Sequence, residues 1–127
     1  MNFALILLDL NKFKPINDDY GHHEGDFALK SFASVMQDAF REVDIIGRIG
    51  GDEFVVFLTD TDNEKLESIL ARFSDLVNQA NVQNAKPYNI EFSAGVVHFP
   101  HDCELSLEQM IQQADDAMYE QKKGRER

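Results

Sequence analysis

Acidic residues stand beside two apolar segments of the chain. Asp9 directly follows the apolar run 3–8, and Asp52 and Glu53 directly follow a Gly-Gly pair. Mg²⁺ is bound in proteins by oxygen ligands, commonly one or two carboxylates together with substrate phosphates. These acids therefore indicate a site for a hard divalent cation, provided that the fold brings them together. In the alternative interpretation, Asp9 ends a strand and Asp52-Glu53 is a solvated turn.

The β-strands that would position these acids can be read from the apolar pattern. Run 3–8 is apolar on both faces and too short for a lone helix, which favours a central strand buried on two sides. Segments 43–49 and 54–58 are β-rich, and Gly50-Gly51 between them predicts a hairpin whose tight turn needs positive φ. Segment 88–99 is typical of another strand.

Helices are predicted where apolar residues recur at helical spacing. Such spacing marks segments 23–40, 66–80 and 107–118, and the polar stretch 11–20 has Pro15 placed for a first helical turn. Capping boxes are predicted at Thr61 with Glu64 and at Ser106 with Gln109.

The order of elements predicts an α+β fold with a βαββαβ, ferredoxin-like core and two extra helices. One follows the first helical region and the other is C-terminal. A right-handed crossover makes the first two strands parallel, and the hairpin strand returns between them. The end of the first strand and the Gly-Gly turn should then lie at the same edge of an antiparallel-rich sheet. The length of 127 residues suits one domain over 1–127.

Charge and cysteine content narrow the function classes. The net charge of −11 disfavours binding to nucleic acid or to an anionic membrane surface, although a metal ion would still permit nucleotide binding. Cys103 is the single cysteine, which fits a reducing, cytoplasmic location. Run 3–8 is too short for a membrane span, and it lacks the preceding basic residue of a signal peptide.

Five ordered blocks of the sequence resemble one family, the GGDEF domain of diguanylate cyclases. The first resemblance is Arg48-Ile49-Gly50-Gly51-Asp52-Glu53-Phe54, which is similar to the family signature. The other blocks are residues 9–18, 21–26, 93–96 and 114–119. Together they extend from about Phe3 to Arg125. The resemblance implies a fold like the palm of nucleotidyl cyclases. It also implies a homodimer that joins two GTP molecules into cyclic di-GMP and releases two pyrophosphates.

The resemblance also implies roles at the metal site. Asp9 and Asp52, with the Leu10 carbonyl, would hold Mg²⁺ or Mn²⁺. Glu53 would support the metals or the attacking hydroxyl, and Lys14 would neutralise charge that develops on the phosphates. In the alternative interpretation, Lys14 is a solvated lysine of a polar helix.

Nucleotide contacts follow in the same way. Asn17 and Asp26 would read guanine, because a carboxylate can accept from both the ring N–H and the exocyclic amine. A turn-forming Asn and a helix N-terminal Asp are the alternative. His22 is a candidate nucleotide contact or a turn histidine, and Lys122 and Arg125 would bind the triphosphate. The chain has one residue fewer than the family before its final Gly-Arg pair, which rotates Arg125 by about 100° on a helix.

Arg41 and Asp44 match the family's RxxD motif at the expected offset, with five residues between Asp44 and Gly50. The motif implies a site where cyclic di-GMP binds and inhibits, and a local ion pair is the alternative. Asn11 replaces a second Asp that is common in the family. The family's D-x-L-T-G-L-x-N-R segment is absent before Met1. We therefore expect a catalytic domain that is normally fused to an N-terminal sensory module.

Two other functions remain as alternatives. A catalytically silent GGDEF domain would bind GTP or cyclic di-GMP as a sensor, without a working metal pair. An RNA-binding βαββαβ domain would show exposed aromatics on its central strands and a basic face, which the net charge of −11 does not favour.

Overall fold

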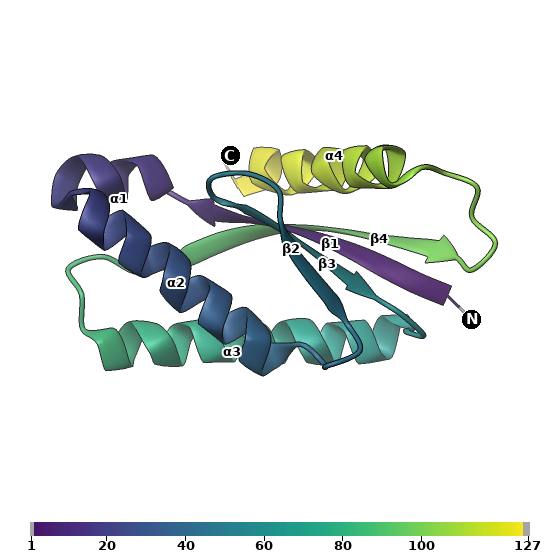
Figure 1. Cartoon of the computed structure of the whole chain (residues 1–127), viewed down its shortest axis with the longest axis horizontal. Coiled ribbons are helices and arrows are strands. Elements are labelled where there is room, and N and C mark those ends of the chain that lie inside the picture. The colour runs from purple at the N-terminus through teal and green to yellow at the C-terminus, as the bar shows by residue number, and fades with distance from the viewer. Residues whose placement is uncertain (1, 126–127) are drawn as a thin grey trace.

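The computed structural model describes residues 2–125, with side chains for residues 2–122 (Figure 1). Its elements are β1 (Asn2–Asn11), α1 (Phe13–Tyr20), α2 (His22–Ala39), β2 (Ile45–Arg48), β3 (Glu53–Leu58), α3 (Asn63–Asn84), β4 (Glu91–Pro100) and α4 (Leu107–Arg125). No helix in the described range is both long enough and apolar enough to cross a membrane.

The four strands form one sheet in the order β2-β3-β1-β4. Strand β1 pairs antiparallel with β3 and with β4, and β3 pairs antiparallel with β2. Strands β1 and β2 therefore run parallel, with β3 returning between them. This confirms the predicted arrangement and the α+β palm fold.

Strand β1 is buried on both faces, as its apolar run predicts. Ala4, Ile6 and Leu8 pack with α2 and α3 in one cluster, and Leu5 and Leu7 pack with α4 in another. The alternation follows from the period of two in a strand. In Figure 1, α2 and α3 lie on one side of the sheet and α4 on the other.

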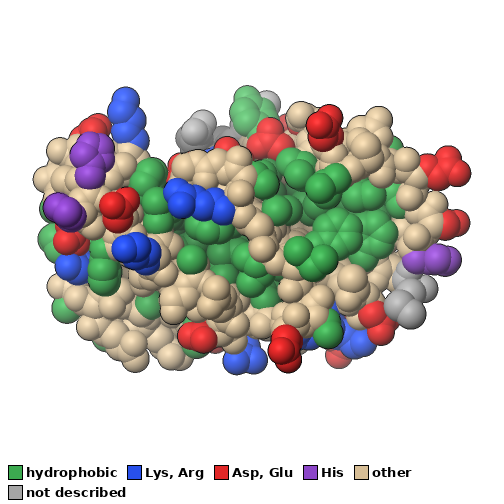
Figure 2. Space-filling model, viewed as in Figure 1, with side chains coloured by type: hydrophobic (Ala, Val, Ile, Leu, Met, Phe, Trp, Pro, Cys, Tyr) green, Lys and Arg blue, Asp and Glu red, His purple; other side chains and the backbone are tan. Residues whose placement is uncertain are grey.

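Helix α4 covers only part of its face of the sheet. Phe57 of β3 is partly buried there and its ring stacks on Phe3, with ring centroids 4.9 Å apart. Ile45, which pairs with Phe57 across the hairpin, is 65% exposed. Figure 2 shows hydrophobic side chains gathered across the middle of the molecule in this view.

The turn between β2 and β3 differs from the prediction. Gly21 is the one glycine with positive φ that the structure describes, so neither Gly50 nor Gly51 needs the left-handed region. The Ile49 N–H donates to the Glu53 carbonyl at 3.0 Å, which leaves Gly50, Gly51 and Asp52 in the loop. Arg48 stabilises this loop by donating to the carbonyls of Gly50 and Gly51, at 3.0 and 2.6 Å.

Two predicted boundaries also differ. The capping box at Thr61 is wrong, because Asp62 is the N-cap of α3 and accepts from the Lys65 N–H at 2.8 Å. Strand β4 begins at Glu91 rather than at residue 88. The Asn81 side chain accepts from the Ile90 N–H at 2.8 Å and donates to the Ile90 carbonyl at 3.0 Å. The backbone of Ile90 is therefore bonded to α3 instead of to a neighbouring strand.

The second predicted capping box is confirmed. The Ser106 hydroxyl accepts from the Gln109 N–H at 3.1 Å, and the Gln109 side chain accepts from the Ser106 N–H at 2.9 Å. The box satisfies two backbone donors at the start of α4.

Candidate metal and nucleotide site

The two acidic groups meet at one end of the sheet, as the topology predicts. Asp9 of β1 is paired with Glu53 of β3 in the strand register. The Leu10 N–H donates to the Asp52 carbonyl at 3.1 Å, which ties the loop to the end of β1. Because these are backbone contacts, the placement of the three carboxylates is a property of the sheet.

Lys122 of α4 joins this group from the face of the sheet that α4 covers, which is also the face of Leu5, Leu7 and Asp9. Its Nζ lies 2.7 Å from Asp9 Oδ2. Asp9 Oδ1 is buried and is the one such side-chain oxygen or nitrogen in the described residues without a hydrogen-bond partner. A buried carboxylate oxygen with no donor is costly unless a cation or a proton reaches it.

The surroundings of Asp52 and Glu53 disfavour the charged forms of these two carboxylates. Burial, and then repulsion from Asp9, raises the pKa of Asp52. Burial and the charges of Asp9 and Asp52 likewise raise the pKa of Glu53. A cation among them would relieve this repulsion. Within residues 2–122, no group of three or more acidic, histidine or cysteine side chains is arranged so that it could hold a metal ion.

A cleft of about 350 Å³ opens between this group and α4. Its walls include Asp115, Asp116 and Tyr119, which the sequence analysis did not assign to the site. Asp115 adds to the charge that raises the pKa of Glu53. It lies seven residues before Lys122, two helical turns away, and that spacing was the available signal.

Helix α4 reaches the site through a close contact with β4. Gly95 lies against the helix backbone, and a Cβ there would overlap the Ala114 carbonyl and crowd the Met118 N–H. The contact sets how deeply α4 sits and therefore where Lys122 lies. Arg125 ends α4, and its side chain lies outside the described residues.

The predicted guanine-binding residues lie on the α1–α2 hairpin directly after β1. Lys14, His22 and Asp26 are exposed, while Asn17 is half-buried. Asn17 packs on Gly25, where a Cβ would overlap Asn17 Oδ1. No hydrogen bond in the described residues joins this hairpin directly to the acidic group.

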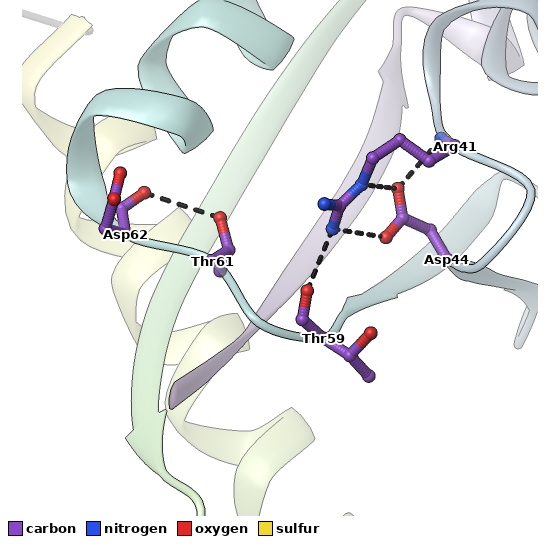
Figure 3. Close-up of polar contacts among 5 residues, drawn as sticks. All are labelled: Arg41, Asp44, Thr59, Thr61 and Asp62. Carbon is purple, nitrogen blue, oxygen red and sulfur yellow. Dashed lines mark hydrogen bonds and ion pairs between the residues drawn. The ribbon is translucent and has the colours of Figure 1, made fainter. Parts of the chain in front are cut away.

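Arg41 and Asp44 lie at the opposite end of the β2–β3 hairpin from the carboxylates (Figure 3). Arg41 Nε and Nη2 donate to Asp44 Oδ2 and Oδ1 at 3.1 and 2.8 Å. Nη2 also donates to the Thr59 carbonyl at 2.9 Å. The hydrogen bonds to Asp44 raise the pKa of Arg41. The pair thus fastens the entry of β2 to the exit of β3.

Several known proteins are similar to this chain over nearly all its length. A relative named Diguanylate cyclase A, from Treponema denticola, is 33% identical over 98% of this chain and 34% of its own length. Diguanylate cyclase DgcZ from Escherichia coli is 35% identical over 100% of this chain and 43% of its own length. The chain therefore spans less than half the length of these relatives.

Solved structures give the same result. Diguanylate cyclase SiaD from Pseudomonas aeruginosa, solved with its activator SiaC, matches with a TM-score of 0.85 and 31% identity, over 97% of this chain and 47% of that one. The GGDEF domain of DgcB from Caulobacter crescentus, solved in complex with c-di-GMP, matches with a TM-score of 0.83 and 25% identity, over 97% and 73%. Residues 1–127 match the family described as "Diguanylate cyclase, GGDEF domain". The chain belongs to the GGDEF family.

Proposed function

We propose that this chain is the catalytic domain of a diguanylate cyclase, which condenses two GTP molecules into cyclic di-GMP. Each 3′-hydroxyl attacks the α-phosphate of the other GTP, its proton passes to a base, and pyrophosphate leaves from each. The observation that carries the proposal is the meeting of Asp9, Asp52 and Glu53 at one sheet end, with Asp9 Oδ1 buried and unpartnered.

The donor set fits Mg²⁺ or Mn²⁺. Asp9, Asp52 and the Leu10 carbonyl would hold the ion, with Glu53 in support. With an ion held by these residues, the α-phosphate would be polarised and the pKa of the attacking hydroxyl would be lowered. Lys122, now paired with Asp9, is close enough to turn to an incoming triphosphate, and Arg125 would follow it. Lys14 would neutralise phosphate charge from the α1 side.

We assign the selection of guanine over adenine to the α1–α2 hairpin. Asp26 is exposed and free to accept from the N–H groups of guanine, and Asn17 and His22 lie nearby on the same hairpin. Adenine does not offer that pair of donors, so the Asp26 carboxylate would be left without its partners when ATP is bound.

Two domains must face each other, because one domain holds one GTP and the reaction needs two. The proposal therefore includes a homodimer, with no nucleic-acid or membrane contact by this domain. It includes product inhibition by cyclic di-GMP at Arg41 and Asp44, supported by the motif and by an Arg41 side chain that is 38% exposed. It also includes a cytoplasmic location, which fits a GTP substrate and the free Cys103.

Residues 1–127 act as one domain, and a sensory module elsewhere in the same protein is supported by the greater length of the relatives.

The direct test is to incubate the chain with GTP and Mg²⁺ and to separate the nucleotides. The expected products are cyclic di-GMP and pyrophosphate, and no cyclic dinucleotide is expected from ATP. A folded chain that binds GTP without converting it, at concentrations where a dimer forms, would instead be the silent sensor.

A further inference from the structure

The α1–α2 hairpin has little anchorage of its own. Helix α1 is 8 residues long, has no side-chain cap and buries only Ile16 among its residues. It lies between two residues with positive φ, Lys12 at 59° and Gly21 at 93°. A helix this short is marginal in isolation, so outside contacts must hold it in place.

The loop between α3 and β4 supplies those contacts. Lys86 Nζ lies 3.1 Å from Glu24 Oε1, and the Tyr88 hydroxyl donates to the same carboxylate at 2.9 Å. The Tyr20 hydroxyl at the end of α1 donates to the Pro87 carbonyl at 3.2 Å. The rings of Tyr20 and Tyr88 lie with centroids 5.3 Å apart. The loop therefore touches both helices of the hairpin.

The loop is itself fixed to the body of the domain. The Asn81 amide is bonded to both backbone groups of Ile90, and Asn84 Nδ2 donates to the Ser31 hydroxyl at 3.2 Å. These contacts tie the two ends of the loop to α3 and to α2. The contacts to Glu24 thus come from a supported segment rather than from a free one.

Three consecutive residues of α2 face three different surroundings. Glu24 meets the loop, Gly25 packs against Asn17, and Asp26 is exposed. Successive helical residues are about 100° apart, so the rotation of this turn decides all three placements together. We propose that Glu24, held by Lys86 and Tyr88, is a positioning residue for the guanine-reading pair Asn17 and Asp26. This inference rests on the proposed GTP-binding function.

An ordinary surface ion pair would not fix the orientation of this helical turn, because exposed ion pairs contribute little to stability. Here the side chains of Lys86 and Glu24 are only 33% and 28% exposed, and the tyrosine adds a second donor. The hydrogen bonds from Lys86 and Tyr88 lower the pKa of Glu24. Burial and the Glu24 carboxylate raise the pKa of Tyr88 to about 12. The Glu24 carboxylate is therefore held by two donors from the loop, Lys86 Nζ and the Tyr88 hydroxyl, rather than by a single ion pair.

The test compares Glu24→Ala and Tyr88→Phe with Glu64→Ala. Glu64 is an exposed glutamate in the first turn of α3, so it matches the helix position of Glu24. The measurement is equilibrium binding of non-hydrolysable GTP and ITP analogues with Mg²⁺. ITP lacks the exocyclic amine that Asp26 would accept from, so the GTP-to-ITP ratio reports the placement of Asp26.

We expect Glu24→Ala to weaken GTP about tenfold and to reduce the GTP-to-ITP ratio, as the loss of a charge-assisted contact should. Tyr88→Phe should do the same to a smaller extent. Glu24→Gln, which keeps an acceptor for Tyr88, should recover part of the ratio. A merely structural role would weaken both nucleotides equally, so an unchanged ratio in Glu24→Ala and Tyr88→Phe overturns the inference.

A second measurement separates this inference from the proposed function. If the wild-type chain binds GTP no better than ATP, the proposed function fails. Amide hydrogen exchange then tests the positioning contact without any nucleotide. Exchange in residues 13–26 should be faster in Glu24→Ala and Tyr88→Phe than in Glu64→Ala. Equal exchange in all three variants overturns the positioning role of Glu24.

Discussion

Asp44 gives both of its carboxylate oxygens to the Arg41 guanidinium, and its side chain is fully buried while that of Arg41 is 38% exposed. Asp44 Oδ2 also accepts from the Arg41 backbone N–H at 2.8 Å. A ligand at this site must therefore share the guanidinium with Asp44 or break the pair. The motif has a structural role in the free domain, whatever it binds.

Replacing Arg41 should separate regulation from catalysis. Arg41→Ala should lose cyclic di-GMP binding and relieve product inhibition, with the initial velocity near wild type, because the pair lies far from the carboxylates. Stability should fall by about 1–3 kcal/mol, because Asp44 keeps only a backbone donor. Arg41→Lys keeps the charge without the fork and is the matched variant. Progress curves with added cyclic di-GMP measure the product inhibition. If Arg41→Ala is inhibited as strongly as wild type, the Arg41–Asp44 pair is a structural ion pair and not an inhibitory site.

Neutralising Asp52 should remove activity without harming the fold. Asp52→Asn should yield no cyclic di-GMP, because the metal loses a ligand. In the absence of metal the variant should melt at a higher temperature than wild type, because a partly buried charge that repels Asp9 is gone. Product analysis and thermal melts in chelator measure the two effects. Asp75→Asn, at an exposed position of α3, is the control, and normal product formation by Asp52→Asn would remove Asp52 from the metal site.

Replacing Lys122 should affect both GTP binding and the stability of the metal-free domain. Lys122→Met should raise the KM for GTP and lower metal-free stability by about 1 kcal/mol, a figure reduced for the partial exposure of the pair. Mg²⁺ should then stabilise the variant more than wild type, because it replaces the missing cation beside Asp9. Lys65→Met, an exposed lysine of α3, serves for comparison. Wild-type values for both KM and metal-free stability would contradict the assignment.

Lowering the pH should weaken metal binding and reduce the repulsion among the carboxylates of the metal-free site. The pKa values of Asp52 and Glu53 are raised by folding, so the folded chain holds these protons more tightly than the unfolded chain. Their contribution to stability therefore falls as pH rises through the raised pKa values and recovers on acidification. Protons and Mg²⁺ compete for the same oxygens. The Mg²⁺-induced rise in melting temperature should shrink as the pH is lowered from about 7 toward the ordinary carboxyl range near about pH 4, and a constant rise would contradict this prediction.

A methyl group at Gly25 should damage the nucleotide site more than the fold. Gly25→Ala gains helix propensity, worth up to about 1 kcal/mol. Its Cβ overlaps Asn17 Oδ1, however, so that side chain must leave its place. We expect weaker GTP binding with nearly wild-type melting, measured by calorimetry beside Ser34→Ala in the same helix. GTP affinity equal to wild type would show that the place of Asn17 does not matter.

Local patterns predicted most of the fold. The two-sided apolar run identified β1 as central, and the handedness of crossovers then placed β3 between β1 and β2. Errors arose where two local patterns competed. Asp62 caps α3 although Thr61 with Glu64 also fits a capping box, and Asn81 keeps Ile90 out of β4 although that segment has strand composition.

The site was predictable only where the sheet register decides it. The meeting of Asp9 with Asp52 and Glu53 follows from topology. The contact of Lys122 with Asp9 does not, because the depth of α4 depends on a glycine contact at Gly95. The cluster at Glu24 also could not be predicted, because its partners lie 62 and 64 positions away in an irregular loop.

The central place of β1 has a consequence for how the chain is made. Both strands that pair with β1 come later in the sequence, and Lys122 lies 113 positions after Asp9. At rates of synthesis of about 5–20 residues per second, Asp9 waits roughly 6–23 s for that partner. During this time the most apolar strand of the domain leaves the ribosome with two open edges. A nascent chain therefore depends on chaperones or on rapid hairpin formation to avoid aggregation, and its nucleotide site is assembled last.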